Sequence, residues 1–142
     1  MRYWDASAVV PLVVSQESTA AALSWLAEDD AVLTWWGTRI ECVSALARRA
    51  REGALQETEV ADAIARLDRL GEVWTEVTPG EAVRRTAVRL LRAYPLRAAD
   101  ALQLAAAVVG AGDSPGSMPF LTLDDRLAEA ASKEGFPIVS PP

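Results

Sequence analysis

The sequence alternates short apolar stretches with longer ones of helical character, and this alternation restricts the chain to an α/β fold. The first expected strand ends at Trp4, and the others span residues 31–35, 73–77, 120–123 and 137–139. The expected helices span residues 8–14, 18–28, 38–52, 57–70, 79–93, 97–109 and 125–134. No two strands are joined by a two-residue hairpin turn, so crossover connections should align them in parallel. We therefore predict a three-layer α/β/α sandwich around a five-stranded, mainly parallel sheet.

The length of the chain and the spacing of these elements indicate one domain over residues 1–142. No linker or internal repeat divides it, and the closing Pro141-Pro142 pair is expected to fray. The single cysteine, Cys42, cannot form an intramolecular disulfide and fits a reducing compartment. No stretch approaches the length of a membrane span, so we expect a cytoplasmic protein without membrane contact.

The absence of histidine makes the strongest exclusion. It removes the Ser-His-Asp and Cys-His types of catalysis, imidazole acid–base chemistry and every metal site that contains histidine. One cysteine cannot build a structural zinc site. Any metal bound here must therefore be a hard ion held by oxygen, which points to Mg²⁺ or Mn²⁺.

Oxygen ligands are available from four carboxylates at the starts of predicted helices, namely Asp5, Glu41, Asp100 and Asp124. Asp5 and Asp124 follow strands and should lie at the same edge of a parallel sheet, with Ser7 as the expected N-cap after Asp5. Asp100 lies in an apolar segment, where a carboxylate should be at least partly buried. Carboxylates packed together raise one another's pKa, and a divalent cation would relieve that repulsion.

Each carboxylate also has a purely structural interpretation; Asp5, for example, could be an exposed strand end. Glu41 could complete a capping box with Thr38. Asp100 lies in a first helical turn and could pair with Arg97, while the segment around Asp124 resembles a helix start.

Four segments carry these residues in a distinctive order and spacing over essentially the whole chain. They are Tyr3-Trp4-Asp5-Ala6-Ser7-Ala8, Thr38-Arg39-Ile40-Glu41, Ala99-Asp100-Ala101-Leu102-Gln103-Leu104-Ala105 and Leu121-Thr122-Leu123-Asp124. In these segments the chain resembles a PIN-domain ribonuclease, in particular the VapC-type toxin of a toxin–antitoxin pair.

The resemblance implies that the catalytic, metal-binding acids are Asp5, Glu41, Asp100 and Asp124. It implies supporting polar groups at Ser7 and Thr122. The loop at residues 110–119 is longer than is usual in the family, so Asp125 stays open as a substitute for Asp124. The implied activity is endonucleolytic hydrolysis of RNA with Mg²⁺ or Mn²⁺, and the implied partners are RNA, an antitoxin protein and a second copy of the chain in a homodimer.

Arginine supplies nearly all of the positive charge, although the net charge is −6. One run without an intervening acid contains Arg84, Arg85, Arg89, Arg92 and Arg97, and a second cluster contains Arg48, Arg49 and Arg51. Solvated helix faces are the ordinary explanation. The functional one is contact with RNA phosphates, for which the candidates are Arg84, Arg85, Arg89 and Arg92. For Trp35-Trp36 we favour core or dimer packing over base stacking.

Two other functions fit parts of the sequence. An aspartyl phosphotransferase also places an aspartate after its first strand, but the haloacid-dehalogenase type needs a second aspartate at the position of Ser7. The receiver type needs a lysine near the last strand, and Lys133 is the only lysine in the chain. A non-catalytic PIN-fold binding module is the other alternative, and the intact set of four acids argues against it.

Overall fold

A central five-stranded sheet organises the computed structural model, which describes residues 1–141. Pro142, in the tail that was expected to fray, lies outside this range. The strands are β1 (Arg2–Trp4), β2 (Val32–Trp35), β3 (Thr75–Val77), β4 (Phe120–Leu121) and β5 (Ile138–Val139). Their order is β3-β2-β1-β4-β5, and all four pairings are parallel. The predicted α/β class and parallel five-stranded sheet are confirmed.

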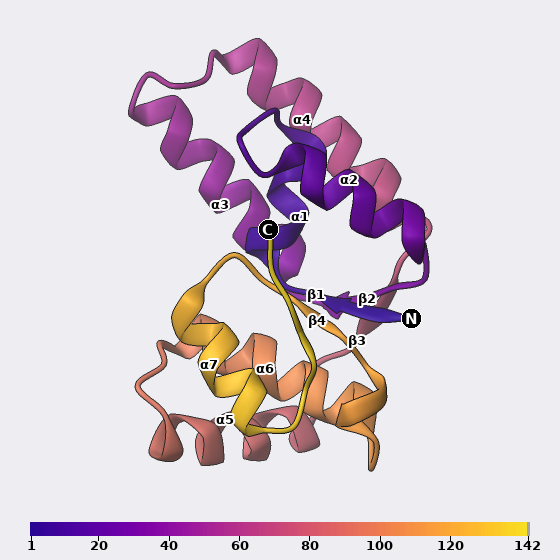
Figure 1. Ribbon diagram of the computed structural model, residues 1–142. Coiled ribbons are helices and arrows are strands. Elements are labelled where there is room, and N and C mark those ends of the chain that lie inside the picture. The colour runs from indigo at the N-terminus through magenta and orange to yellow at the C-terminus, as the bar shows by residue number, and fades with distance from the viewer. Residues whose placement is uncertain (142) are drawn as a thin grey trace.

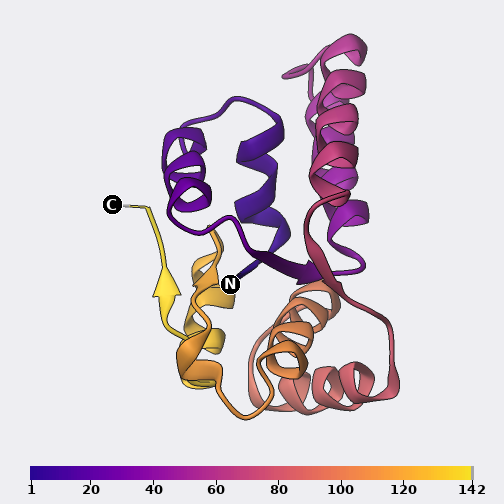
Figure 2. The ribbon, with the colours of Figure 1, turned by 90° about the vertical axis from the view of Figure 1, so that its right-hand side faces the viewer.

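Helices cover both faces of this sheet (Figure 1). They are α1 (Ala6–Val13), α2 (Thr19–Glu28), α3 (Thr38–Arg51), α4 (Glu57–Gly71), α5 (Glu81–Ala93), α6 (Ala98–Ala111) and α7 (Asp125–Lys133), with a 3-10 turn η1 (Pro115–Ser117). Helices α1 to α4 lie on one side and α5 to α7 on the other; α3 and α4 extend side by side beyond the sheet (Figures 1 and 2). Within residues 1–141, no helix combines the length and the apolar character that crossing a membrane requires.

Two hydrophobic cores follow from the alternation of side chains along the strands. Tyr3 and Phe120 point to one face, where their rings stack with centroids 5.0 Å apart in the core formed with α5, α6 and α7. Trp4 and Leu121, the next residue in each strand, point to the other face and pack with α1 to α4. This double burial explains why β1 and β4 are apolar at successive positions.

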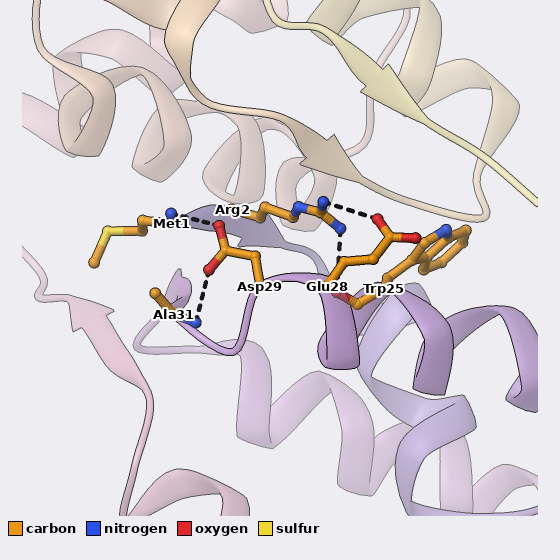
Figure 3. Close-up of polar contacts among 6 residues, drawn as sticks. All are labelled: Met1, Arg2, Trp25, Glu28, Asp29 and Ala31. Carbon is orange, nitrogen blue, oxygen red and sulfur yellow. Dashed lines mark hydrogen bonds and ion pairs between the residues drawn. The ribbon is translucent and has the colours of Figure 1, made fainter.

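The amino end of β1 is tied to the end of α2 by polar contacts (Figure 3). The amino group of Met1 lies 2.6 Å from Oδ2 of Asp29, and the guanidinium of Arg2 donates to Oε2 of Glu28 at 2.9 Å and to the carbonyl of Trp25 at 3.1 Å. These contacts fix the strand at the end remote from Asp5.

Strands β3 and β4 are shorter than the sequence predicts, and β4, expected to reach residue 123, ends at Leu121. The expected strand at residues 73–77 begins only at Thr75, because the backbone N–H groups of Val73 and Trp74 both donate to the carbonyl of Leu70. These bonds prolong the last turn of α4, so the alternating pattern at Val73 is not used for strand pairing.

Candidate active site

The strand order places a ligand-binding edge between β1 and β4. The chain leaves β1 on one side to build β2 and β3, and then returns to β4 on the other side. Open α/β sheets bind ligands at the carboxyl ends of the strands where such a reversal occurs. Asp5 directly follows β1, and Asp124 lies shortly after β4. The topology therefore brings the first and last of the predicted acids to one edge.

Asp5 is the N-cap of α1 and is only 5% exposed. Its Oδ1 accepts hydrogen bonds from the hydroxyl of Ser7 at 2.7 Å and from the backbone N–H of Ala8 at 3.2 Å. Burial raises the pKa of the Asp5 carboxyl from 3.8 to about 6, although these bonds act in the opposite direction. The expectation that Ser7 would be the N-cap is wrong, because the carboxylate two residues earlier takes that position and α1 begins at Ala6.

Glu41 faces α6 rather than capping its own helix. Its Oε2 accepts a hydrogen bond from Nε2 of Gln103 at 2.6 Å, and the capping box with Thr38 does not form because Thr38 is already inside α3. Burial raises the pKa of Glu41 from 4.5 to about 7, with further contributions from the charges of Asp5 and Asp100. Glu41 is thus electrostatically coupled to two other predicted acids.

Asp100 lies in the first turn of α6 and is partly buried, as its apolar surroundings in the sequence predict. Its Oδ2 accepts from the backbone N–H of Arg97 at 3.3 Å, and the Arg97 guanidinium makes no ion pair with it. Burial raises the pKa of Asp100, and the charge of Asp124 adds to the rise, while Arg97 and Arg126 oppose it.

The loop after β4 is bonded to the start of α1 through two hydroxyl groups. The Ser7 hydroxyl accepts from the backbone N–H of Leu123 at 2.8 Å and lies 3.3 Å from the Thr122 hydroxyl. Thr122 accepts from the N–H of Asp124 at 3.0 Å, and Asp124 caps α7 by accepting from the N–H of Leu127 at 2.9 Å. Ser7 and Thr122 therefore hold the segment of Asp124 beside Asp5.

An open cavity of about 910 Å³ lies at this edge of the sheet, and its lining combines acidic with basic side chains. The acidic lining residues are Glu41, Asp100, Asp124 and Asp125. The basic ones are Arg48, Arg97 and Arg126, none of which forms an ion pair within residues 1–141. No three side chains of His, Cys, Asp or Glu in that range are arranged as a ready metal site.

The predicted RNA-contacting arginines lie on α5, and none of them lines this cavity. Arg84 pairs with Glu81 at 2.9 Å, and Arg89 makes two hydrogen bonds to the carboxylate of Glu134 at 2.8 and 3.0 Å. Trp35 is buried, as packing predicts, whereas Trp36 is 50% exposed.

Two features of the site escaped the sequence prediction. Arg126 follows the two aspartates of the α7 start, and Gln103 is the only polar residue among the alanines and leucines of residues 101–107. Gln103 lies three positions after Asp100, which places both on one side of a helix. That spacing was the signal that could have revealed it.

The chain is similar to curated proteins over nearly its whole length. It is 35% identical over 136 residues to Ribonuclease VapC45 and to Ribonuclease VapC49, both of Mycobacterium tuberculosis. Each alignment covers 94% of this chain and 90% of the relative. The similarity to each relative therefore extends over nearly the whole of both chains and does not depend on one motif.

Solved structures share the fold. The crystal structure of FitAcB from Neisseria gonorrhoeae matches with a TM-score of 0.72 at 16% identity, covering 99% of this chain and 97% of that one. The structure of PAE2754 from Pyrobaculum aerophilum matches with a TM-score of 0.61 at 24% identity, covering 98% and 84%. The family model of the PIN domain matches residues 2–133. The chain therefore belongs to the PIN domain family, and within it to the VapC type.

Proposed function

We propose that this protein is a metal-dependent endoribonuclease that acts as the toxin of a type II toxin–antitoxin pair. The observation that carries the proposal is the cavity at the carboxyl ends of the strands. It is lined by three of the four predicted acidic ligands and by arginines that form no ion pair within residues 1–141. The two similar curated proteins are ribonucleases by name. Family membership sets the phosphotransferase alternative aside, because that interpretation needs a different fold.

The donor set fits a hard divalent cation. It offers carboxylate oxygens alone, since the chain has no histidine and its one cysteine is buried. The residues that would hold Mg²⁺ or Mn²⁺ are Asp5, Glu41, Asp100 and Asp124, with Asp125 the alternative to the last. When bound, such an ion would activate water and stabilise the charge that develops on the phosphate in hydrolysis.

Other side chains of the protein would hold the site together and bind the RNA phosphates. Ser7 and Thr122 keep the segments of Asp5 and Asp124 together. Arg48 and Arg126 form no ion pair in the described part of the chain, and their guanidinium groups suit phosphate oxygens. The arginines also explain how a chain with a net charge of −6 would bind RNA locally.

Cleavage of a mixed RNA pool in Mn²⁺ and in chelator tests this function. We expect fragments with 5′-phosphate and 3′-hydroxyl ends in Mn²⁺ and intact RNA in EDTA, because the carboxylates have no catalytic partner without the ion. Asp5→Asn, purified in parallel, controls for contaminating ribonuclease. Cleavage that persists in EDTA would contradict metal dependence, and intact RNA under both conditions would favour a non-catalytic binding module.

The cavity arginines and the α5 arginines make a matched comparison for RNA binding. Replacing Arg48 and Arg126 with glutamine should weaken binding to single-stranded RNA and lower its salt dependence. With fewer phosphate contacts, binding releases fewer counterions from the RNA. The double variant Arg85→Gln with Arg92→Gln removes the same amount of charge from α5. It tests the RNA contact that the sequence predicted for the α5 arginines. Filter binding over a salt series gives both quantities.

The result assigns the RNA path. A weaker, less salt-dependent interaction only in the cavity pair would place the phosphates at the cavity, whereas a loss in both pairs would extend the path over α5. If neither pair changes binding while both proteins stay folded, the arginines are ordinary solvated side chains.

We also propose an antitoxin partner and a homodimer. Large apolar side chains near the cavity support an interface: Trp36 is 50% exposed and Ile40 is 61% exposed. Both line an apolar groove that continues through Leu102 to Val88 and Leu91 of α5. Exposed apolar residues that form one continuous surface are typical of protein interfaces. For the antitoxin, α2 and α3 are the candidate surface by analogy with the family.

A further inference from the structure

The amide of Gln103 lies where α6, α3 and β1 meet, and it is 1% exposed. Its Nε2 donates to Oε2 of Glu41 at 2.6 Å and to the hydroxyl of Thr38 at 3.0 Å. Its Oε1 accepts from the hydroxyl of Tyr3 at 2.7 Å. Each polar atom of the amide therefore has a partner on another element.

The chemistry of these partners fixes which way the amide points. A glutamate that binds a cation is ionised and has no proton to donate, so the Glu41 carboxylate must then face the NH₂ group. A rotated amide would place its carbonyl oxygen against the Glu41 carboxylate, two acceptors in contact. Tyr3 is fully buried, and Oε1 is the acceptor that its hydroxyl reaches.

The Thr38 hydroxyl connects the amide to the backbone beside Asp5. It accepts from the N–H of Trp35 at 3.2 Å and lies 2.7 Å from the hydroxyl of Thr34. Thr34 in turn donates to the carbonyl of Trp4, the residue before Asp5, at 2.7 Å. This series of hydrogen bonds thus connects the Gln103 amide to the end of β1, next to Asp5.

Glu41 needs such a partner because its side chain has three rotatable bonds. Within residues 1–141 its carboxylate makes no other hydrogen bond than the one from Gln103. A free glutamate would lose rotamer entropy on binding a cation, whereas a glutamate already held in place loses less.

We propose that Gln103 is a positioning residue that orients the Glu41 carboxylate for the cation, and that Tyr3 holds the amide in the required orientation. The inference rests on the proposed function, since it gives Glu41 the role of a ligand. It adds two residues that have no charge and do not themselves reach the cavity.

Calorimetric titration of the RNA-free protein with Mn²⁺ tests the proposal through affinity instead of activity. Gln103→Met keeps the volume but removes the amide, and should weaken Mn²⁺ binding by about 10- to 100-fold, the usual loss when a group that holds a metal ligand is removed. Tyr3→Phe should weaken binding less. The double variant should bind no more weakly than Gln103→Met, because Tyr3 acts only through the amide.

Tyr94→Phe is the matched control. Like Tyr3→Phe, it removes a tyrosine hydroxyl that donates a hydrogen bond. Here the acceptor is Oε1 of Glu134 at 2.8 Å, and neither residue lines the cavity. Its Mn²⁺ affinity should equal that of the unsubstituted protein. Circular dichroism and thermal melts establish that each variant is folded.

The outcomes separate the two proposals. Unchanged Mn²⁺ affinity in folded Gln103→Met would overturn the positioning role while leaving the proposed function intact. If Gln103→Met does not fold, Tyr3→Phe decides in the same way, because it preserves the packing of the core. Failure of the unsubstituted protein to bind Mn²⁺ would overturn the proposed function, and this inference with it.

Discussion

Replacing Asp5 or Asp100 with asparagine should abolish RNA cleavage while leaving the protein folded. Each substitution keeps the shape of the side chain and removes one charged oxygen ligand. The loss should exceed the roughly 100-fold that follows when a group merely supporting a metal ligand is removed. Cleavage rates in saturating Mn²⁺ measure it. Asp62→Asn, an exposed position on α4, is the matched control and should cleave normally.

The same variants should be at least as stable as the parent in metal-free buffer. Asparagine still offers Asp5's oxygen to the backbone N–H of Ala8 and Asp100's oxygen to the N–H of Arg97. Removing either charge also relieves repulsion from the neighbouring acids. Thermal melts in EDTA provide the comparison.

A structural role for these carboxylates makes the opposite prediction. If Asp100 served mainly to stabilise the turn at Arg97, Asp100→Asn would lower the melting temperature and spare cleavage. Variants of Asp5 and Asp100 that are less stable and still cut RNA would remove both residues from the proposed site.

The metal-free protein should lose stability as the pH rises from about 4 to 8. The native pKa of Asp5 is about 6 and that of Glu41 about 7, against ordinary values of 3.8 and 4.5. The native state therefore binds more protons than the unfolded state in this window, and the free energy of unfolding falls with rising pH. For Asp5 the difference corresponds to about 3 kcal/mol; Glu41 is less buried and should contribute less.

Urea denaturation in EDTA at pH 5 and at pH 8 measures this loss. The interpretation is direct because the chain has no histidine that would titrate in the same range. Asp5→Asn should show a shallower pH dependence, since its side chain no longer ionises. Mn²⁺ should restore stability at pH 8, because a ligand that binds only the native state shifts the equilibrium by mass action.

Two results would contradict this account. Stability that is constant or rises between pH 5 and pH 8 would mean that Asp5 and Glu41 do not retain protons in the native protein. A melting temperature that stays unchanged throughout a Mn²⁺ titration at pH 8 would argue against a metal site at these carboxylates.

Much of the fold was determined by local chemistry that the sequence displays. The central strands β2, β1 and β4 are largely apolar because both faces of the sheet are covered, and α7 begins at Asp124, whose side chain accepts from a free N–H group. The family and the identity of the candidate acids followed from four short segments. The single-domain expectation over residues 1–142 stays a prediction.

The sequence prediction of helix caps was wrong at the starts of α1 and α3. Asp5 and Ser7 can both cap α1, and only the path of the chain after β1 gives that position to Asp5. Glu41 matches a capping box, yet Thr38 lies within the helix and Glu41 turns to Gln103 instead. For Glu41, the hydrogen bond from Gln103 of α6 outweighs the local alternative.

The arrangement of the site depended on the tertiary structure. The sequence by itself determined the carboxylates and their order, since these are read residue by residue. The placement of β4 beside β1, which brings Asp124 to Asp5, was decided by long-range strand pairing. The packing of α6 likewise decided that Gln103 meets Tyr3 and Glu41, residues 100 and 62 positions away. Such contacts depend on where whole elements pack, which no local periodicity encodes.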